Sequence, residues 1–360
     1  MATKENKTDE NKKADKKLKI STVFYALIIA IAAYFVLIGI LIYGFGTSNK
    51  LTKFTAKYVP YPAAVVNQKN FITIDALRSN LQSIKSFYEN QDFSSIGMRV
   101  DFSTEDGKKR LQIRERGLLN KMIEDEAIEI LARRNGIIIT AEAADQNVER
   151  KLEEYGNKEE VENRLSRLYG WTLSDFKEKI VKPAMYREEL EKMVLSQKKE
   201  EFSREAREKI EKAADLLSEK KDFAEVANSY SQGLTAGEGG ELGWFRKNQL
   251  IPELADLIFS LQKGKRSDII ESSLGYHIVE VENRKVENGE ELVKIRQIFA
   301  RKKTFADWLG EEMGKMRILI PLKDYYWDSQ RLLVEFKDAG MREFEKDVRE
   351  NFQGDASIIF

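Results

Sequence analysis

A single apolar run between residues 23 and 45 dominates the hydropathy pattern of the chain. It reads VFYALIIAIAAYFVLIGILIYGF and contains neither a charged residue nor a proline. As a helix it would extend about 34 Å, enough to cross a hydrocarbon core of about 30 Å. A cleaved signal peptide is the alternative, but its apolar region usually covers only about 7 to 15 residues. We therefore expect one uncleaved transmembrane helix over residues 23–45.

A helical period follows, from Ile74 to about Ser196, where apolar residues recur at steps of three and four. Gly136 should end the clearest of these helices, and Pro183 should kink or break a later one. The period is clearest at Leu111, Leu118, Leu119, Met122, Ile123, Ala127, Ile130 and Leu131. This stripe predicts the packed core of a mostly helical domain.

Shorter elements of mixed type follow from Phe202, which predicts a compact α+β unit. After a charged helix and a glycine cluster, we expect a helix over 253–261 and strands near 268–271 and 276–281. Beyond Lys303 we expect a helix around Trp308, an apolar strand over 317–322 and a long mixed-charge helix from about 329 to 351.

Composition excludes several classes of protein. Charged residues make up 33% of the chain and the formal net charge is +0, so the basic excess typical of nucleic-acid binding is missing. With 0 Cys and 1 His, disulfides, thiol nucleophiles and multi-histidine metal sites are excluded. No nucleophile and base can be paired, which leaves a hydrolase without support.

The flanks of the apolar run predict its orientation, because cytoplasmic segments are rich in Lys and Arg. The lysines before the run are Lys4, Lys7, Lys12, Lys13, Lys16, Lys17 and Lys19. We expect a single-pass protein of the cell membrane with a cytoplasmic N-terminus and the bulk of the chain outside the cytoplasm.

The expected organisation has six segments. They are a disordered cytoplasmic tail (1–22), the transmembrane helix (23–45), a linker that acts as a tether (46–62), a helical domain (63–199), an α+β domain (200–302) and a C-terminal strand and helix that pack on the helical domain (303–360). The strand over 317–322 would pair with a short apolar strand over 63–66.

Four ordered blocks lie between residues 222 and 281. They read DFAEVANSYS (222–231), GGELGWF (239–245), IPELADLIFSLQKG (251–264) and GYHIVEV (275–281). In order and spacing they resemble the parvulin family of peptidyl-prolyl isomerases. The preceding segment, with RGLLNKMIEDEAIEILARRNGIIIT and YGWTLSDFKEKI, is similar to the helical chaperone domain of exported SurA-like and PrsA-like foldases. The expected fold is α+β, with a transmembrane helix, a mostly α-helical chaperone domain and a small antiparallel parvulin-like sheet with flanking helices.

The resemblance implies an enzyme that rotates an X-Pro amide, whose barrier is about 18 to 20 kcal/mol, without cofactor or metal. Its partners would be unfolded or extended exported polypeptides and, through the anchor, the lipid bilayer. The proline pocket maps to Leu242, Leu250 and Leu254, with Phe259 in the supporting core. His277 matches the histidine on the last strand of the family's sheet. Taken by itself, a histidine on such a strand is more often a buried, hydrogen-bonded residue than an acid or base.

The opening strand of the family, with its first histidine, is missing before residue 222. The segment VKIRQIFA (293–300) resembles that strand, with Gln297 in place of the histidine. Either the domain is circularly permuted, or a second, degenerate copy begins here. We expect the permutation, which requires residues 293–299 to pair with residues 276–281, because the two strands are central neighbours in the family's sheet.

Two further positions depart from the family. Gly233 stands where an acidic or thiol residue is expected, and Leu254 stands where the family has a pocket phenylalanine. Together with Gln297 they favour an alternative function, a non-catalytic holdase or scaffold that binds extended polypeptides. The glycine, proline and histidine blocks favour the isomerase.

Overall fold

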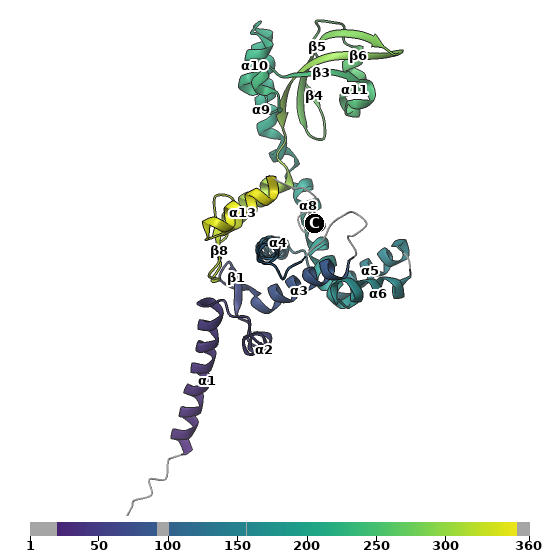
Figure 1. The fold of residues 1–360 in the computed structure, drawn as a ribbon. Helices are drawn as coiled ribbons and strands as arrows, with labels where there is room; N and C mark the ends of the chain where they lie inside the picture. Colours follow the sequence, from purple (N-terminus) through teal and green to yellow (C-terminus); the bar gives the residue numbers. More distant parts are fainter. Residues whose placement is uncertain (1–19, 92–100, 156, 351–360) are drawn as a thin grey trace, which may run out of the picture. The chain divides into compact units, whose positions relative to one another are not determined.

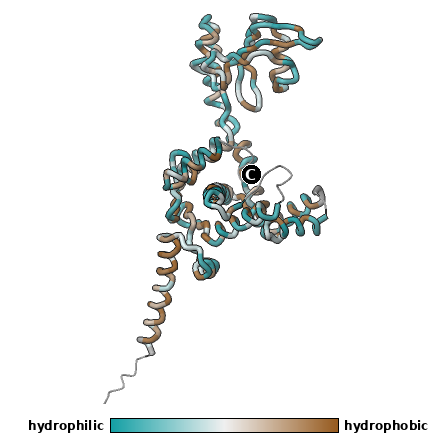
Figure 2. Tube along the Cα trace, viewed as in Figure 1, coloured by the Kyte–Doolittle hydropathy of each residue, from teal (hydrophilic) through white to brown (hydrophobic). Residues whose placement is uncertain are grey.

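The computed structural model describes residues 20–91, 101–155 and 157–350 (Figure 1). The described chain is mostly helical and contains small antiparallel sheets, so the α+β fold class is confirmed. The predicted tail, residues 1–22, lies outside the described residues as far as residue 19. The apolar run forms most of helix α1 (Ile20–Tyr43), which Figure 2 shows as a continuous hydrophobic stretch.

The chain divides into two compact units. The first comprises Met1–Ile123, Leu168–Gly170 and Arg317–Phe360, and the second comprises Glu124–Arg167 and Trp171–Met316. The boundary falls inside helix α4 (Glu105–Arg134), so this helix contributes residues to both units.

In the first unit, β1 (Pro62–Val66) is the centre of a sheet with the order β2-β1-β7. Strand β7 (Ile318–Leu319) is antiparallel to β1, and Val65 lies opposite Leu319. The pairing expected between residues 63–66 and 317–322 is therefore present. The sheet is followed directly by a helix, because Thr73 caps α3 by accepting a hydrogen bond from the Ala76 amide at 3.1 Å. The other bounds here are β2 (Asn70–Thr73) and α3 (Ile74–Asn90).

The linker predicted over 46–62 contains helix α2 (Lys50–Tyr58), which the sequence did not predict. Asn49 and Thr52 form a reciprocal cap: the Asn49 side chain accepts from the Thr52 amide at 2.9 Å, and the Thr52 hydroxyl accepts from the Asn49 amide at 3.1 Å. Such a cap satisfies amide donors that the first turn of a helix leaves open.

The long helix predicted from 329 to 351 is wrong over residues 329–338. A hairpin of β8 (Tyr325–Asp328) and β9 (Leu333–Phe336) precedes helix α13 (Ala339–Glu350). Asp328 accepts hydrogen bonds from the amides of Gln330 and Arg331, and Leu332 has a left-handed backbone with φ of 53°. These features form a turn that a helix cannot contain.

Helix α13 is joined to α4 by a buried ion pair. Arg116 donates to Glu345 at 2.6 Å and, through its other terminal nitrogen, to the Val334 carbonyl at 2.8 Å. Segments more than 200 residues apart in sequence, 218 for Arg116 and Val334, are therefore held together inside the first unit.

Helices and one sheet make up the second unit. Pro183 lies where a π-helical turn (Lys177–Val181) passes directly into α8 (Lys182–Gln197). The helical run is irregular next to the proline but does not end there, so of the predicted kink or break the break is absent. The remaining helices are α5 (Ala141–Tyr155), α6 (Lys158–Tyr169, whose end belongs to the first unit), α7 (Leu173–Phe176), α9 (Lys199–Ser218), α10 (Phe223–Tyr230), α11 (Pro252–Ser260) and α12 (Phe305–Gly314).

The sheet of the second unit has four antiparallel strands in the order β3-β6-β5-β4. Helices α9 and α10 cover one face and α11 covers the other (Figure 1). The strands are β3 (Glu241–Arg246), β4 (Ile270–Glu271), β5 (Gly275–Glu287) and β6 (Glu290–Arg301).

Strands β5 and β6 form a long hairpin at the centre of this sheet. Tyr276 lies opposite Ala300 and Val281 lies opposite Ile295, so the pairing predicted between 276–281 and 293–299 is present. Because β6 also pairs with β3, it completes the same sheet. A circular permutation requires β6 to pair within this sheet, whereas a second copy of the domain does not.

Candidate functional site

The apolar residues predicted for the proline pocket lie together on the α11 face of the sheet. Leu254 belongs to the buried cluster there with Ile258, Val279 and Ile295. Leu242, Leu250 and Phe259 are partly buried and pack against the same cluster. The structure therefore brings all four predicted pocket residues into one apolar environment, although they come from β3, α11 and the loop between them.

The predicted polar residues lie on the same face. Side chains alternate along a strand, and Tyr276, Ile278, Ile298 and Ala300 belong to the cluster under α9 and α10. His277 and Gln297 therefore face α11, as do Val279 and Ile295. Gln297 on β6 lies opposite Val279 on β5, two residues after His277. His277 and Gln297 are therefore diagonal neighbours on adjacent strands.

The backbone of Gln297 is hydrogen bonded to the residue that precedes β3. The Gln297 main-chain N–H donates to the carbonyl of Gly240 at 2.8 Å, and Glu241 begins the strand. Gly240 has a left-handed backbone with φ of 79°, and a Cβ at this position would overlap the Gln297 carbonyl oxygen. The glycine cluster thus lets two backbones approach closely beside the candidate site.

His277 is 3% exposed and is held from both sides. Its Nε2 lies 2.7 Å from the Ser272 hydroxyl oxygen, with one proton between them in either tautomer. Its ring stacks on Phe299 with centroids 4.7 Å apart. Ser272 in turn accepts from the Leu274 amide at 3.1 Å, which ties the imidazole to the turn before β5.

Burial lowers the pKa of His277 from 6.5 to about 4, and nearby Gln297 and Glu253 only partly oppose this. Although Gln297 faces the ring, no hydrogen bond of normal geometry reaches Nδ1 from the described residues. The imidazole is therefore neutral at physiological pH. The ring is held by the hydrogen bond to Ser272 and by the stack on Phe299.

We expect the single histidine of the chain to titrate in the folded protein with a pKa of about 4. Its contribution to stability is complete above pH 6.5, the ordinary value, and is lost as the pH falls towards 4, because only the unfolded imidazole binds a proton in that interval. With one histidine, its NMR signals are unambiguous. A measured pKa near 6.5 would contradict this environment.

Three contributors to the site were not predicted from the sequence. Ser272 and Phe299 hold His277, and the hydroxyl of Ser231 accepts from the amides of Phe299 at 3.1 Å and Gly233 at 3.2 Å. The serine that bonds His277 becomes a neighbour only after a turn closes, so no periodic signal identifies it. Gly233 itself lies beside Phe299, where a Cβ would meet no atom closer than 3.5 Å.

The domain that contains this site matches a known family. Residues 182–283 match the family model described as Rotamase: PPIC-type PPIASE domain. The chain contains a rotamase domain of the parvulin type. The matched segment ends inside β5, so β6, which completes the sheet of the rotamase domain, lies outside the match.

Two curated relatives are similar to part of the chain. Chaperone SurA of Burkholderia orbicola is 36% identical over 96 residues, which are 25% of this chain and 21% of that protein. Chaperone SurA of Methylobacillus flagellatus is 32% identical over 128 residues, which are 34% of this chain and 29% of that protein. The chain therefore matches less than a third of the length of either relative.

Among solved structures, PrsA from Bacillus subtilis is 18% identical, and the superposition covers 65% of this chain and 83% of that chain with a TM-score of 0.19. A TM-score this low does not establish a common arrangement of the whole chain.

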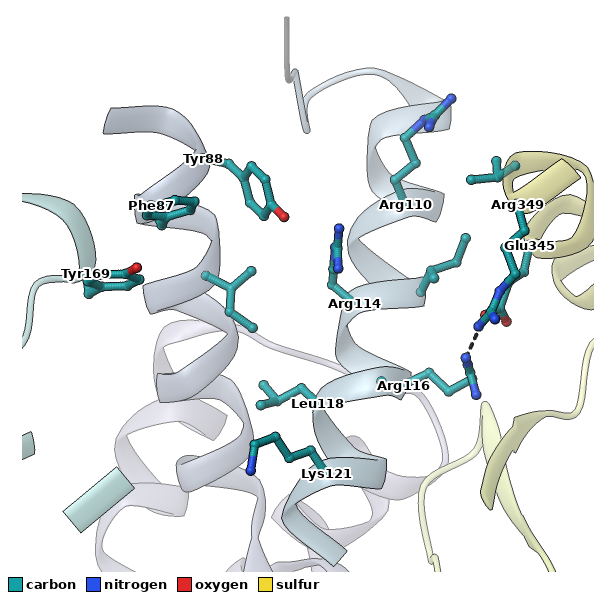
Figure 3. Close-up of a pocket in the computed structure, with 14 residues that line it drawn as sticks. Phe87, Tyr88, Arg110, Arg114, Arg116, Leu118, Lys121, Tyr169, Glu345 and Arg349 are labelled. Atoms are coloured by element: carbon teal, nitrogen blue, oxygen red, sulfur yellow. Dashed lines mark hydrogen bonds and ion pairs between the residues drawn. The ribbon is translucent and has the colours of Figure 1, made fainter. Parts of the chain in front are cut away.

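A second candidate site is a cavity of about 850 Å³ in the first unit, between α3, α4 and α13 (Figure 3). Tyr169 closes one side by stacking on Phe87, with centroids 5.1 Å apart and planes 9° apart. Aliphatic side chains add to these rings, and cationic side chains from α4 and α13 line the opposite side. This volume lies within the range of ligand-binding pockets and is lined by the mixture of apolar and polar groups typical of them.

Within the described residues, no group of three or more His, Asp or Glu side chains could hold a metal ion.

Proposed function

We propose that the chain is a membrane-anchored, extracytoplasmic foldase that isomerises X-Pro bonds of unfolded exported polypeptides. The observation that carries the proposal is the common sheet face shared by Leu242, Leu250, Leu254 and Phe259 with His277 and Gln297. An apolar surface would hold the proline ring, and the polar groups beside it would favour the twisted amide of the transition state. No bond is cleaved, so no cofactor or metal is required.

The catalytic contributions we propose differ between the two polar residues. Gln297 is partly accessible and carries an amide that can donate a hydrogen bond to the substrate. His277 is buried and hydrogen bonded to Ser272, so it would position neighbouring side chains and would not touch the substrate.

Polypeptide binding would take place in the helical part of the chain. The name Chaperone SurA of the relatives supports a role in handling unfolded chains. The cavity beside Phe87 and Tyr169 is a suitable place, because flat aromatic and aliphatic surfaces bind apolar side chains without strict sequence requirements. The domain boundaries we propose remain 63–199 for the chaperone domain, 200–302 for the rotamase domain and 303–360 for the C-terminal segment.

The anchor would be α1. One helix of the described chain, Val23–Tyr43, is long and apolar enough to cross a membrane. The lysines before it support a cytoplasmic N-terminus, which would leave the chain after α1 on the other side of the membrane.

A non-catalytic holdase is the second candidate, and Gly233 favours it. The loop at this position has room for a side chain beside Phe299, yet it carries none, and Gln297 replaces a histidine. In this candidate the rotamase domain would bind extended segments without accelerating isomerisation.

A protease-coupled assay on a proline-containing peptide tests the two candidates with the full chain in detergent. We expect isomerisation faster than the uncatalysed reaction, and we expect Leu242→Ala or Leu250→Ala to lower kcat/KM by roughly tenfold through lost apolar contact with the substrate. Leu257→Ala is the matched control, because Leu257 lies on α11 but is 51% exposed.

A rate equal to the uncatalysed one would rule out the isomerase. A gain of activity in the double variant Gly233→Asp/Gln297→His, from an inactive parent, would then support the holdase, because it would mean that only the polar groups of the site are missing.

A further inference from the structure

Helix α2 exposes an apolar stripe that its own fold does not cover. Thr52, Thr55 and Ala56 are buried. On the other side Leu51, Phe54 and Tyr58 are 49%, 64% and 68% exposed, and the rings of Phe54 and Tyr58 are 5.1 Å apart. Their spacing of three and four residues places them on one stripe of the helix.

Three lysines lie beside this stripe. With 3.6 residues per turn, Lys50, Lys53 and Lys57 fall on a neighbouring stripe of the same helix. A short helix with aromatic and leucine side chains on one face and lysines next to them has the composition of helices that lie in the surface of an anionic membrane.

The contacts between α2 and α1 show at which level along α1 the exposed stripe of α2 lies. The Tyr34 and Thr55 hydroxyl groups are hydrogen bonded at 2.7 Å, and the Tyr61 hydroxyl donates to the Phe35 carbonyl at 2.8 Å. Tyr34 lies about nine residues before the end of α1 at Tyr43, or roughly 14 Å along the helix.

The part of α1 before this contact is too short to cross a bilayer. From Val23 to Tyr34 there are about 12 residues, roughly 18 Å of helix, whereas the hydrocarbon core is about 30 Å thick. A helix α1 that spans the bilayer must therefore carry α2 at the level of the outer acyl chains and headgroups. Ile38 and Ile42 of α1 are 0% and 2% exposed, so one side of this level is occupied by the chain itself.

We propose that α2 lies in the headgroup region of the membrane surface from which α1 emerges and binds anionic phospholipid there. Leu51, Phe54 and Tyr58 enter the boundary with the acyl chains, and Lys50, Lys53 and Lys57 reach the lipid phosphates. This inference rests on the anchor in the proposed function. It adds a second, lipid-specific attachment that holds the first unit close to the bilayer.

Site-directed spin labelling of the full chain in lipid nanodiscs tests the proposal, because the protein has 0 Cys and each label is unique. The labelled variants are Phe54→Cys on α2, Ile31→Cys in α1 as the bilayer reference, and Lys69→Cys in the exposed β1–β2 turn as the aqueous reference. We expect the Phe54 label to favour oxygen over a water-soluble nickel complex, as the Ile31 label does and the Lys69 label does not.

Lipid composition provides the second readout. We expect the Phe54 label to lie deeper in nanodiscs that contain phosphatidylglycerol than in pure phosphatidylcholine. We also expect the variant Lys50→Gln/Lys53→Gln/Lys57→Gln to lose this difference while the Ile31 label is unchanged.

Several results would overturn the proposal. A Phe54 label that behaves like the Lys69 label while Ile31 remains in lipid would reject the surface helix and leave the anchor intact. An Ile31 label in water would reject the anchor and the surface helix together. Protection of Phe54 from both reagents would indicate a second copy of the chain on this stripe instead of lipid.

Discussion

Glu345→Ala is expected to destabilise the first unit by about 3 to 5 kcal/mol, the usual cost of removing one partner of a buried ion pair. Glu345 and Arg116 have side chains only 9% and 10% exposed, and they are 2.6 Å apart. Without the carboxylate, the Arg116 guanidinium stays buried and charged, and the Val334 carbonyl at 2.8 Å cannot neutralise it. Hydrogen exchange in α4 and α13 measures the loss unit by unit, since a chain with two units does not unfold in one transition.

Two control variants separate this effect from a general loss of surface charge. Arg349 also contacts Glu345 at 2.6 Å, but its side chain is 64% exposed, so Arg349→Ala should cost at most about 1 kcal/mol. Arg116→Met/Glu345→Leu removes both charges together and should recover most of the lost stability. Equal destabilisation by Arg349→Ala and Glu345→Ala would contradict the importance of burial.

The central hairpin could be predicted because each of its strands carries its own pattern. Alternation identifies residues 276–281 and 293–300 as strands, and the short polar segment between them favours a hairpin. The structure extends both strands outward, to Glu287 and Glu290, where Asn288 and Gly289 adopt positive φ of 53° and 80°. That turn is encoded locally, since Asn-Gly is the preferred pair for such geometry.

Helix α2 and the β8–β9 hairpin were not predicted, because in each segment the composition favours one structure and local side-chain hydrogen bonds favour another. Residues 50–58 have lysines and threonines that suit a tether, but the cap between Asn49 and Thr52 starts a helix there. Mixed charge favoured a helix over 329–351, but the side chain of Asp328 bonds the following amides and stops it.

The two candidate sites differ in how far they can be predicted from the sequence. The family blocks could predict the four pocket residues, His277 and Gln297 because these residues lie in short continuous segments. The cavity of the first unit joins α3, Tyr169 and α13, which lie far apart in the chain. No local period relates Phe87 to Tyr169 or Arg116 to Glu345, so only the tertiary structure reveals these contacts.

Gly240→Ala is expected to destabilise the rotamase domain by about 2 to 5 kcal/mol, the sum of a left-handed backbone and an overpacked contact. Gly240 has φ of 79°, and its new Cβ would overlap the Gln297 carbonyl oxygen and press on Ala227 at 3.3 Å. Strand β6 must then move away from β3 at the residue that we place in the site. Isomerase activity, where present, should fall with stability.

Variants of two nearby glycines separate the cost of the left-handed backbone from the cost of the overpacked contact. Gly243 has φ of 88°, but an added Cβ would meet no atom within 4 Å, so Gly243→Ala should show only the backbone cost, about 1 to 2 kcal/mol. Gly237 has neither a positive φ nor a close neighbour, and Gly237→Ala should change stability by less than about 0.5 kcal/mol. Urea unfolding, followed by hydrogen exchange in β5 and β6, should therefore rank the variants Gly240, Gly243, Gly237 in decreasing cost. If Gly240→Ala costs no more than Gly243→Ala, β6 does not pack against Gly240 in solution, and the placement of Gln297 beside β3 is wrong.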